Sequence, residues 1–362
     1  MATRRQLADE LGLSRPTLSS VMSELTSHDY VSRISEVQGP TGRKAGMYRL
    51  APGAGHVIGI DAGSTRIMAR VATPDGRELY SATRGLSGGQ PELNAVISAG
   101  VAAVMDDIRI AAQSQWGPLR TIGIALPARV GRQDEPDVLT APLFSHFAPP
   151  RDIPVLLENN VNCAAIAEHQ HGIAQGHDSF AYVQVGMKIG MGLVLGGRLI
   201  RGANGATGEL SWVPFPFAPD KTPAPQALET YLGAEALMTR VQDSWPPGQS
   251  PAPDTTTALF RLAEEGCAPA VAAIERQGRD LARLIAVCVA VTDPGLVVLG
   301  GGVGQNPVLI PFVQRHLEEI ALPVQVITST LGADATLAGI TSMAARSAVL
   351  NLMKAPADPL DP

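Results

Sequence analysis

The chain has 362 residues, which is too long for one small core. Of these, 45% are hydrophobic and 17% charged, a globular composition that excludes a largely disordered protein. Aromatic residues make up only 4%, which argues against stacking on single-stranded nucleic acid as the main binding mode. The net charge is −6, but residues 1–50 carry +2 and the remainder −8, so only the N-terminal segment suits a polyanion such as DNA.

The N-terminal segment begins with two predicted helices. The first covers Arg4–Leu11 and ends at Gly12, which favours a helix C-terminus. Ser14 is a good N-cap for the second, and Pro16 falls in its first turn, where a missing N–H is harmless. The apolar residues of the second helix recur at i, i+3, i+4 and i+7 and are predicted to form one buried stripe: Leu18, Val21, Met22 and Leu25.

The opposite face of the second helix has the composition of a helix that reads the major groove of double-stranded DNA. Short hydroxyl side chains and an arginine near the N-terminus allow close approach to base edges. The predicted contacts are Arg15, Thr17, Ser19, Ser20 and Ser23.

Two short strands are predicted next, at residues 30–34 and 47–50. The glycine-flanked loop between them ends in Arg43 and Lys44, which we expect to reach phosphates or the minor groove as a wing. The alternative is an ordinary helical cap with a solvated basic loop. A winged helix normally packs three helices, so either the first helix is missing here or the true start lies upstream.

The body opens with an apolar strand at residues 57–65 that ends in a glycine turn, followed by a second strand at 67–73. Asp61, Gly63 and Thr65 lie in that turn, where backbone amides can approach a phosphate and a carboxylate can hold a metal-bound water. Further motifs follow in order at residues 123–127, 155–162, 186–192, 201–210, 297–302 and 329–335.

This order of motifs resembles the ROK family of repressors, uncharacterised open reading frames and sugar kinases, over nearly the whole chain. The resemblance implies an α/β protein: a winged helix-turn-helix head, then a two-lobed sugar-kinase fold of the actin and hexokinase type with a cleft between the lobes. The expected divisions are a head (1–50), a linker (51–56), a first lobe (57–163), a second lobe (164–334), a C-terminal helix returning to the first lobe (335–353) and a disordered tail (354–362).

Two departures from the family's kinase pattern predict that catalysis is lost. The kinases resemble Glu-Asn-Asp-x-Asn, with the Asp as general base, and Asn160 stands at that position. Their second phosphate loop resembles Gly-Thr-Gly-Ile-Gly, and Met187 and Lys188 replace its Thr and middle Gly. We therefore expect no catalytic residue and no cofactor. The vestigial phosphate-binding positions, which have a purely structural alternative, are Asp61, Gly63, Thr65, Gly186, Gly190 and Gly301.

No metal is expected either. The resemblance implies a zinc site with one His and three cysteines, but Trp212 stands at the His position. Residues 213–226 contain no cysteine and five prolines. The chain's three cysteines are scattered, which also argues against a disulfide framework.

The sugar-reading positions are partly retained. Glu209 matches the family Glu that accepts hydrogen bonds from sugar hydroxyls, and Asn159 and Asn160 can still donate and accept. Trp212 either stacks on a sugar face or fills a gap in the packing. Glu158 is expected to stabilise the strand-to-helix turn rather than to contact ligand.

The sequence therefore predicts a DNA-binding transcriptional regulator that binds a small carbohydrate effector without phosphorylating it. We expect it to be cytoplasmic, with no membrane partner, and to bind its DNA operator as a homodimer or dimer of dimers. One alternative is an ATP-dependent sugar kinase with a DNA-binding appendage. Another is a DNA-bound scaffold whose cleft senses nothing.

Overall fold

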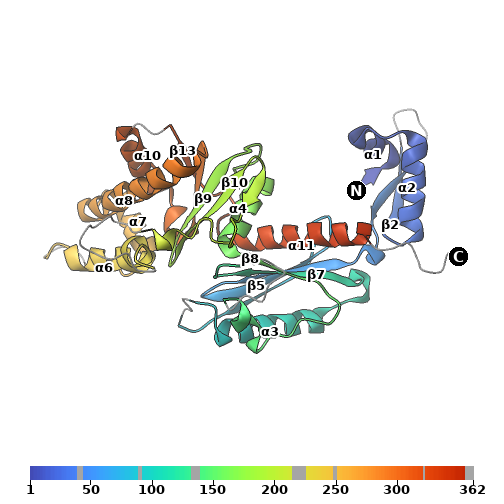
Figure 1. Ribbon diagram of the computed structural model, residues 1–362, viewed down its shortest axis with the longest axis horizontal. Helices are drawn as coiled ribbons and strands as arrows, with labels where there is room; N and C mark the ends of the chain where they lie inside the picture. Colours follow the sequence, from blue (N-terminus) through green and yellow to red (C-terminus); the bar gives the residue numbers. More distant parts are fainter. Residues whose placement is uncertain are drawn as a thin grey trace.

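The computed structural model describes residues 1–38, 44–88, 92–131, 139–213, 226–247, 251–320 and 323–354. These residues form a small head and a body with two five-stranded sheets (Figure 1). In the described segments, no helix is long and apolar enough to cross a membrane.

The head packs two helices on an antiparallel sheet of order β1-β3-β2. Its elements are β1 (Ala2–Thr3), α1 (Arg4–Leu11), α2 (Arg15–Ser27), β2 (Val31–Gln38) and β3 (Lys44–Leu50). Both predicted caps are confirmed: Gly12 follows α1 with a φ of 63°, and the Ser14 hydroxyl accepts a hydrogen bond from the Thr17 amide at 3.2 Å. These local signals fix the sharp turn between the helices.

The core of the head is smaller than the predicted stripe. Leu18 and Met22 are buried against Ala8, and Leu25 is half-buried beside them. Val21, however, is 39% exposed, so its predicted burial is wrong. None of the described apolar clusters includes Val21, which leaves it on the outer side of α2.

The hairpin of the head is longer than predicted. The strands extend beyond residues 30–34 and 47–50 because backbone pairing continues through polar positions as far as Gln38 and Lys44, with a bulge between Arg33 and Ser35. The tip of the predicted wing, including Arg43, lies outside the described residues.

The predicted linker, residues 51–56, is packed against the body. It contains a 3-10 turn, Pro52–Ala54. The Gly53 amide donates to the Asp29 carboxylate of the head at 3.0 Å, and the Arg120 guanidinium of the body donates to the Gly53 carbonyl at 2.6 Å. Head and body are therefore joined by hydrogen bonds as well as by the chain.

The first sheet of the body has the order β6-β5-β4-β7-β8, with β4, β7 and β8 parallel. Helices α3 and α11 pack against it. The helix α11 approaches closely because Gly59 lies under Thr341: a Cβ at Gly59 would come within 2.2 Å of the Thr341 hydroxyl. The bounds are β4 (His56–Ala62), β5 (Arg66–Ala72), β6 (Glu78–Gly85), β7 (Leu119–Leu126), β8 (Val155–Asn159), α3 (Ala95–Ala111) and α11 (Ala335–Lys354).

The second sheet has the order β11-β10-β9-β12-β13. Side chains of β9, β10 and β12 share one large apolar core with the helices that follow β11, whereas α4 contributes to a separate core with the same strands. The bounds are α4 (Asn160–His171), β9 (Phe180–Val185), β10 (Ile189–Leu195), β11 (Arg198–Ile200), α5 (Glu229–Leu232), α6 (Ala234–Ser244), α7 (Thr256–Glu264), α8 (Ala268–Thr292), β12 (Leu296–Gly300), α9 (Gly301–Gly304), α10 (Ile310–Glu319) and β13 (Gln325–Thr328).

Helices α4 and α11 lie side by side between the two sheets (Figure 1). Their contact needs glycine at position 339, where a Cβ would come within 1.8 Å of the Cys163 carbonyl oxygen. The division expected between residues 163 and 164 falls inside α4. The proposed tail lies outside the described residues, apart from Lys354 at the end of α11.

Candidate ligand pocket and DNA-binding surface

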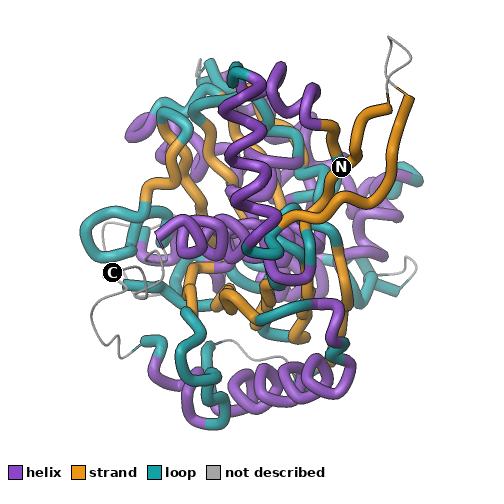
Figure 2. Tube along the Cα trace, turned by 90° about the vertical axis from the view of Figure 1, so that its right-hand side faces the viewer, coloured by secondary structure: helices purple, strands orange, loops and turns teal. Residues whose placement is uncertain are grey.

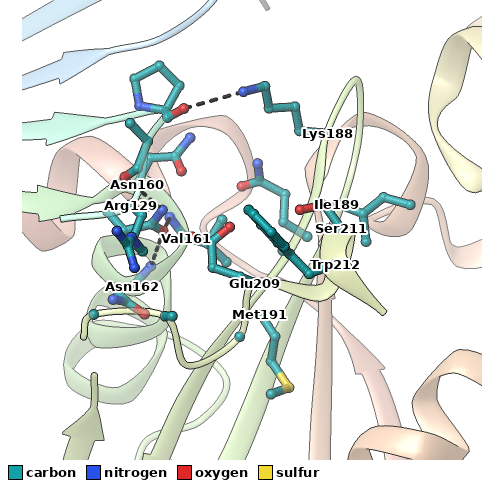
Figure 3. A pocket seen from close by; sticks show the side chains of 18 of the residues that line it. Arg129, Asn160, Val161, Asn162, Lys188, Ile189, Met191, Glu209, Ser211 and Trp212 are labelled. Carbon is teal, nitrogen blue, oxygen red and sulfur yellow. Dashed lines mark hydrogen bonds between the residues drawn. The ribbon is translucent and has the colours of Figure 1, made fainter. Parts of the chain in front are cut away.

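A cavity of about 850 Å³ opens between the ends of β7 and β8 on one side and β10 with the loop after β11 on the other (Figure 3). This volume is within the usual range for small-molecule sites. The four residues predicted to bind an effector line it together: Asn159, Asn160, Glu209 and Trp212.

Asn159 lines the cavity and also stabilises the protein around it. It caps α4, because its Oδ1 accepts hydrogen bonds from the amides of Val161 at 2.8 Å and Asn162 at 3.3 Å. Its Nδ2 donates to the Ala128 carbonyl at 3.2 Å. One N–H of the amide group remains for a ligand.

Asn160 is the first residue of α4 and is more available. Its carbonyl accepts a hydrogen bond from the Thr336 hydroxyl at 3.3 Å, whereas its side chain lines the cavity and makes no hydrogen bond to another described residue. A carboxamide can donate to and accept from a ligand, but it cannot take up a proton at neutral pH.

Glu209 enters the pocket after a tight glycine turn. Gly208 has a φ of 83°, and a Cβ there would come within 1.8 Å of the Met191 carbonyl oxygen. Burial raises the pKa of the Glu209 carboxyl, although Lys188 and Arg129 act to lower it. The carboxylate thus lies near two cations in a partly desolvated place, where it can accept hydrogen bonds from hydroxyl groups.

Trp212 lines the same cavity and is 67% exposed. This exposure does not fit the alternative that it merely fills a gap in the packing. An indole held at the edge of a pocket offers a flat apolar surface for a sugar ring. Among the described residues, no cluster of His, Cys, Asp and Glu could hold a metal ion; the proline-rich segment 214–225 lies outside them.

Sequence reasoning missed several pocket residues. Arg129 follows the end of β7, and Glu92 and Gln226 meet across the pocket through a hydrogen bond of 3.0 Å. Burial raises the pKa of Glu229, against the lowering influence of Lys188 and of the Ile189 backbone. None of these residues lies in a recognisable motif, so only the fold could bring them together.

Glu158 and Arg201 support the wall from behind. The Glu158 side chain is only 3% exposed and pairs with the Arg201 guanidinium at 2.6 Å. Its other carboxylate oxygen accepts hydrogen bonds from the Asn159 amide and the Asn162 side chain, both at 2.9 Å. This arrangement supports the predicted structural role of Glu158, since its oxygens are directed to the protein.

The predicted vestigial phosphate positions do not gather in the cavity, which includes only Gly190 of the six. Loss of hydration raises the pKa of Asp61 at the end of β4 to about 7, despite the nearby Arg66. Two glycines have packing reasons. A Cβ at Gly190 would meet the Val161 side chain at 3.1 Å, and a Cβ at Gly301, which has a φ of 80°, would come within 2.6 Å of the Val185 carbonyl oxygen. The remaining three predicted positions are Gly63, Thr65 and Gly186. At Gly186 a Cβ would fit, because its nearest neighbouring atom would lie 3.7 Å away.

The proposed DNA-reading helix α2 lies at the outer end of the molecule, and in the turned view it stands in front of the body (Figures 1 and 2). Its predicted contact residues are exposed except Ser19, which is half-buried: Arg15, Thr17, Ser20 and Ser23. The exposed Val21 belongs to the same surface. Its methyl groups can contact the methyl group of a thymine. The sequence did not indicate this role, because the spacing of Val21 is that of a buried residue.

At the wing, Lys44 begins β3 with a side chain that is 76% exposed and 3.6 Å from the Glu36 carboxylate. An exposed pair of this kind is weak and can be exchanged for a phosphate contact.

Comparison with known proteins shows that residues 57–347 match the ROK family. The xylose repressor of Bacillus subtilis is 28% identical over 249 residues, covering 66% of this chain but only 64% of that relative, so the chain matches less than two thirds of its length. A ROK family transcriptional regulator, a homolog of the E. coli MLC protein, superposes over 98% of this chain and 94% of its own with a TM-score of 0.72 and 20% identity. The ROK hexokinase of Thermus thermophilus covers 83% of this chain and 99% of its own, with a TM-score of 0.61 and 29% identity.

Proposed function

Because the chain belongs to the ROK family, we propose that it is a DNA-binding transcriptional regulator, acting as a repressor, whose body binds a sugar or sugar-derived effector without phosphorylating it. The observation that carries this proposal is the joining of an exposed, hydroxyl-bearing helix α2 to a body with a polar, tryptophan-edged pocket.

The head supports the DNA-binding part. Ser14 caps the N-terminus of α2, and the side chains of Arg15 and Thr17 are exposed in the first turn of this helix. Ser20 and Val21 extend this surface along the helix. Small side chains let a helix approach base edges, and the arginine supplies charge for a phosphate or a guanine.

The pocket supports the sugar-binding part. Asn160 offers both a donor and an acceptor, and Glu209 offers acceptors near Lys188 and Arg129. The Trp212 ring lies at the edge of these polar groups. Alternating donors and acceptors beside an aromatic surface suit a polyhydroxyl ring, whose hydroxyls both donate and accept.

The absence of phosphorylation rests on Asn160. A lost general base alone lowers a rate by about 10²–10⁴-fold, and Met187 and Lys188 alter the loop that would position a phosphate. The alternative function is an ATP-dependent sugar kinase with a DNA-binding head. It is favoured by the retained Asp61 and by the resemblance to a hexokinase.

Two assays separate these functions. Repeated selection of duplexes from a random pool should enrich one sequence with the wild-type chain and fail with a Thr17→Glu, Ser20→Glu double variant, whose carboxylates repel phosphate. With ATP, Mg²⁺ and common hexoses or pentoses, the chain should show no sugar-dependent ATP consumption. A turnover near about 1 s⁻¹, ordinary for an enzyme, would support the kinase instead.

We also propose that the operator is bound by a homodimer or dimer of dimers. One small head makes few contacts, whereas two heads on a two-fold axis read an inverted repeat with half-sites about one helical turn, or a multiple, apart. Sedimentation with the selected duplex should show at least two chains per duplex, and a single chain would contradict this.

A further inference from the structure

We infer that the sugar bound by this pocket carries an anionic group, a phosphate or a carboxylate, which lies between Asn160 and Lys188. The inference rests on the proposed sugar-binding function and specifies the class of sugar.

Asn160 and Lys188 enter the cavity from different elements (Figure 3). Asn160 begins α4, whereas Lys188 lies in the turn between β9 and β10. The resemblance implies that, in the kinases, the residue at position 160 takes the proton from the reacting hydroxyl and the loop at 186–192 binds the phosphate. Since the transferred phosphoryl group lies between nucleophile and donor, both substitutions change the surroundings of one point.

The two substitutions change the charge at this point in the same direction. An aspartate there would repel a second anion, whereas the Asn160 amide can donate a hydrogen bond to it. Lys188 adds a cation where the kinase pattern has a glycine. Together they convert a place suited to a neutral hydroxyl into one suited to an oxyanion.

The Lys188 ammonium group has N–H donors that no described residue accepts from. Its side chain is half-buried, and its hydrogen bond to a described residue goes to the Pro127 carbonyl at 3.4 Å, which is long for an ammonium donor. It forms no ion pair with a described carboxylate, and the Asn160 side chain is also without a described partner. The remaining N–H groups of both side chains are available to a ligand.

The other charges of the pocket can serve a different part of the same ligand. The charges of Arg129 and Lys188 both influence the Glu209 carboxyl. The charge of Lys188 also influences the Glu229 carboxyl, as do the carboxylates of Glu209 and Glu92. Carboxylates accept hydrogen bonds from sugar hydroxyls. Arg129, which has no hydrogen bond or ion pair to a described residue, helps to offset the charge of Glu209. Hydroxyl recognition and anion recognition are thus assigned to separate groups.

The test compares neutral sugars with their anionic counterparts on the full chain: D-glucose, D-xylose and N-acetyl-D-glucosamine against the corresponding sugar phosphates and D-glucuronate. Inorganic phosphate serves as the control for a free anion. Calorimetric titration should give at least one anionic sugar a Kd about tenfold lower than its neutral counterpart, the effect of one charge-assisted contact. Phosphates and uronates together show which oxyanion is preferred.

Two variants test the residues. Lys188→Met keeps an unbranched stem of similar length without the charge, and Asn160→Asp restores a carboxylate. Each should lower the preference for the anionic over the neutral sugar, measured as the ratio of their two Kd values, about tenfold. Arg198→Met, which removes an exposed charge on β11 outside the pocket, is the matched control.

The outcomes distinguish this inference from the function on which it rests. Neutral and anionic sugars that bind equally, or a preference that survives Lys188→Met, would overturn the anionic class but leave sugar binding intact. Binding of inorganic phosphate alone would show an adventitious anion and would overturn it as well. If no sugar of either class binds, both the inference and the proposed effector function are wrong.

Discussion

Replacement of Arg120 by methionine should loosen the head from the body without unfolding either. The Arg120 guanidinium donates to the Gly53 carbonyl at 2.6 Å and to the Ala54 carbonyl at 3.3 Å. Asp29, in a left-handed conformation with a φ of 55°, accepts from the Gly53 amide on the other side. Methionine keeps the apolar stem and removes both donors.

The size of the effect follows from these two bonds. Hydrogen bonds to charged groups contribute about 1.5–3 kcal/mol each, and the longer bond and the half-buried position reduce this to roughly 2–3 kcal/mol in total. Since about 1.4 kcal/mol is a factor of ten, local opening at residues 51–54 should become about 30-fold to 140-fold more frequent.

Amide hydrogen exchange measures this opening directly. The Gly53 amide, and the Ala51 amide that donates to the Tyr30 carbonyl at 2.9 Å, should exchange faster by that factor in Arg120→Met. Arg77→Met, at an exposed arginine in the β5–β6 turn, is the matched control and should not change them. Unchanged exchange at both amides in Arg120→Met would show that the Arg120 hydrogen bonds do not hold the head to the body.

The remaining predictions concern the pocket, the wing and the Asp61 carboxyl. Glu209→Ala should abolish sugar binding in calorimetry while DNA affinity without sugar stays intact; undiminished binding would remove Glu209 from the site. Lys44→Ala should weaken DNA binding for all sequences and lower the salt slope by about one unit, and an unchanged slope would argue against a phosphate contact. Asp61 has a pKa raised from 3.8 to about 7, so its neutral form stabilises the fold at low pH and this stability is lost as the pH rises through about 7. Urea unfolding should therefore show Asp61→Asn more stable than wild type at pH 8, by at most roughly 4 kcal/mol, and nearly equal at pH 4; equal stability at both values would contradict the shift.

Local chemistry explains what the sequence made predictable. Gly12 and Ser14 act through their own backbone and the next residues, so the helix ends of the head follow from short-range signals. The order of the body's motifs led to the family resemblance, and the resemblance to four residues of the pocket.

Features that depend on tertiary neighbours could not be predicted from the sequence. Val21 has the spacing of a core residue, and only the absence of a described element over it shows that it is exposed. The exposure of Trp212 and the meeting of Glu92 with Gln226 depend on loops from distant parts of the chain. Arg120 gave no signal because its partners are backbone carbonyls, which carry no sequence identity.

In the proposed function, a sugar bound in the body changes how the head binds DNA. Fluorescence anisotropy with the duplex enriched from the random pool tests this most directly, with the Kd measured at one salt concentration with and without saturating sugar. We expect the Kd to change by at least about fivefold, which is typical of coupled binding sites, and not to change in Glu209→Ala. An equal Kd with and without a sugar that calorimetry shows to be bound would contradict it.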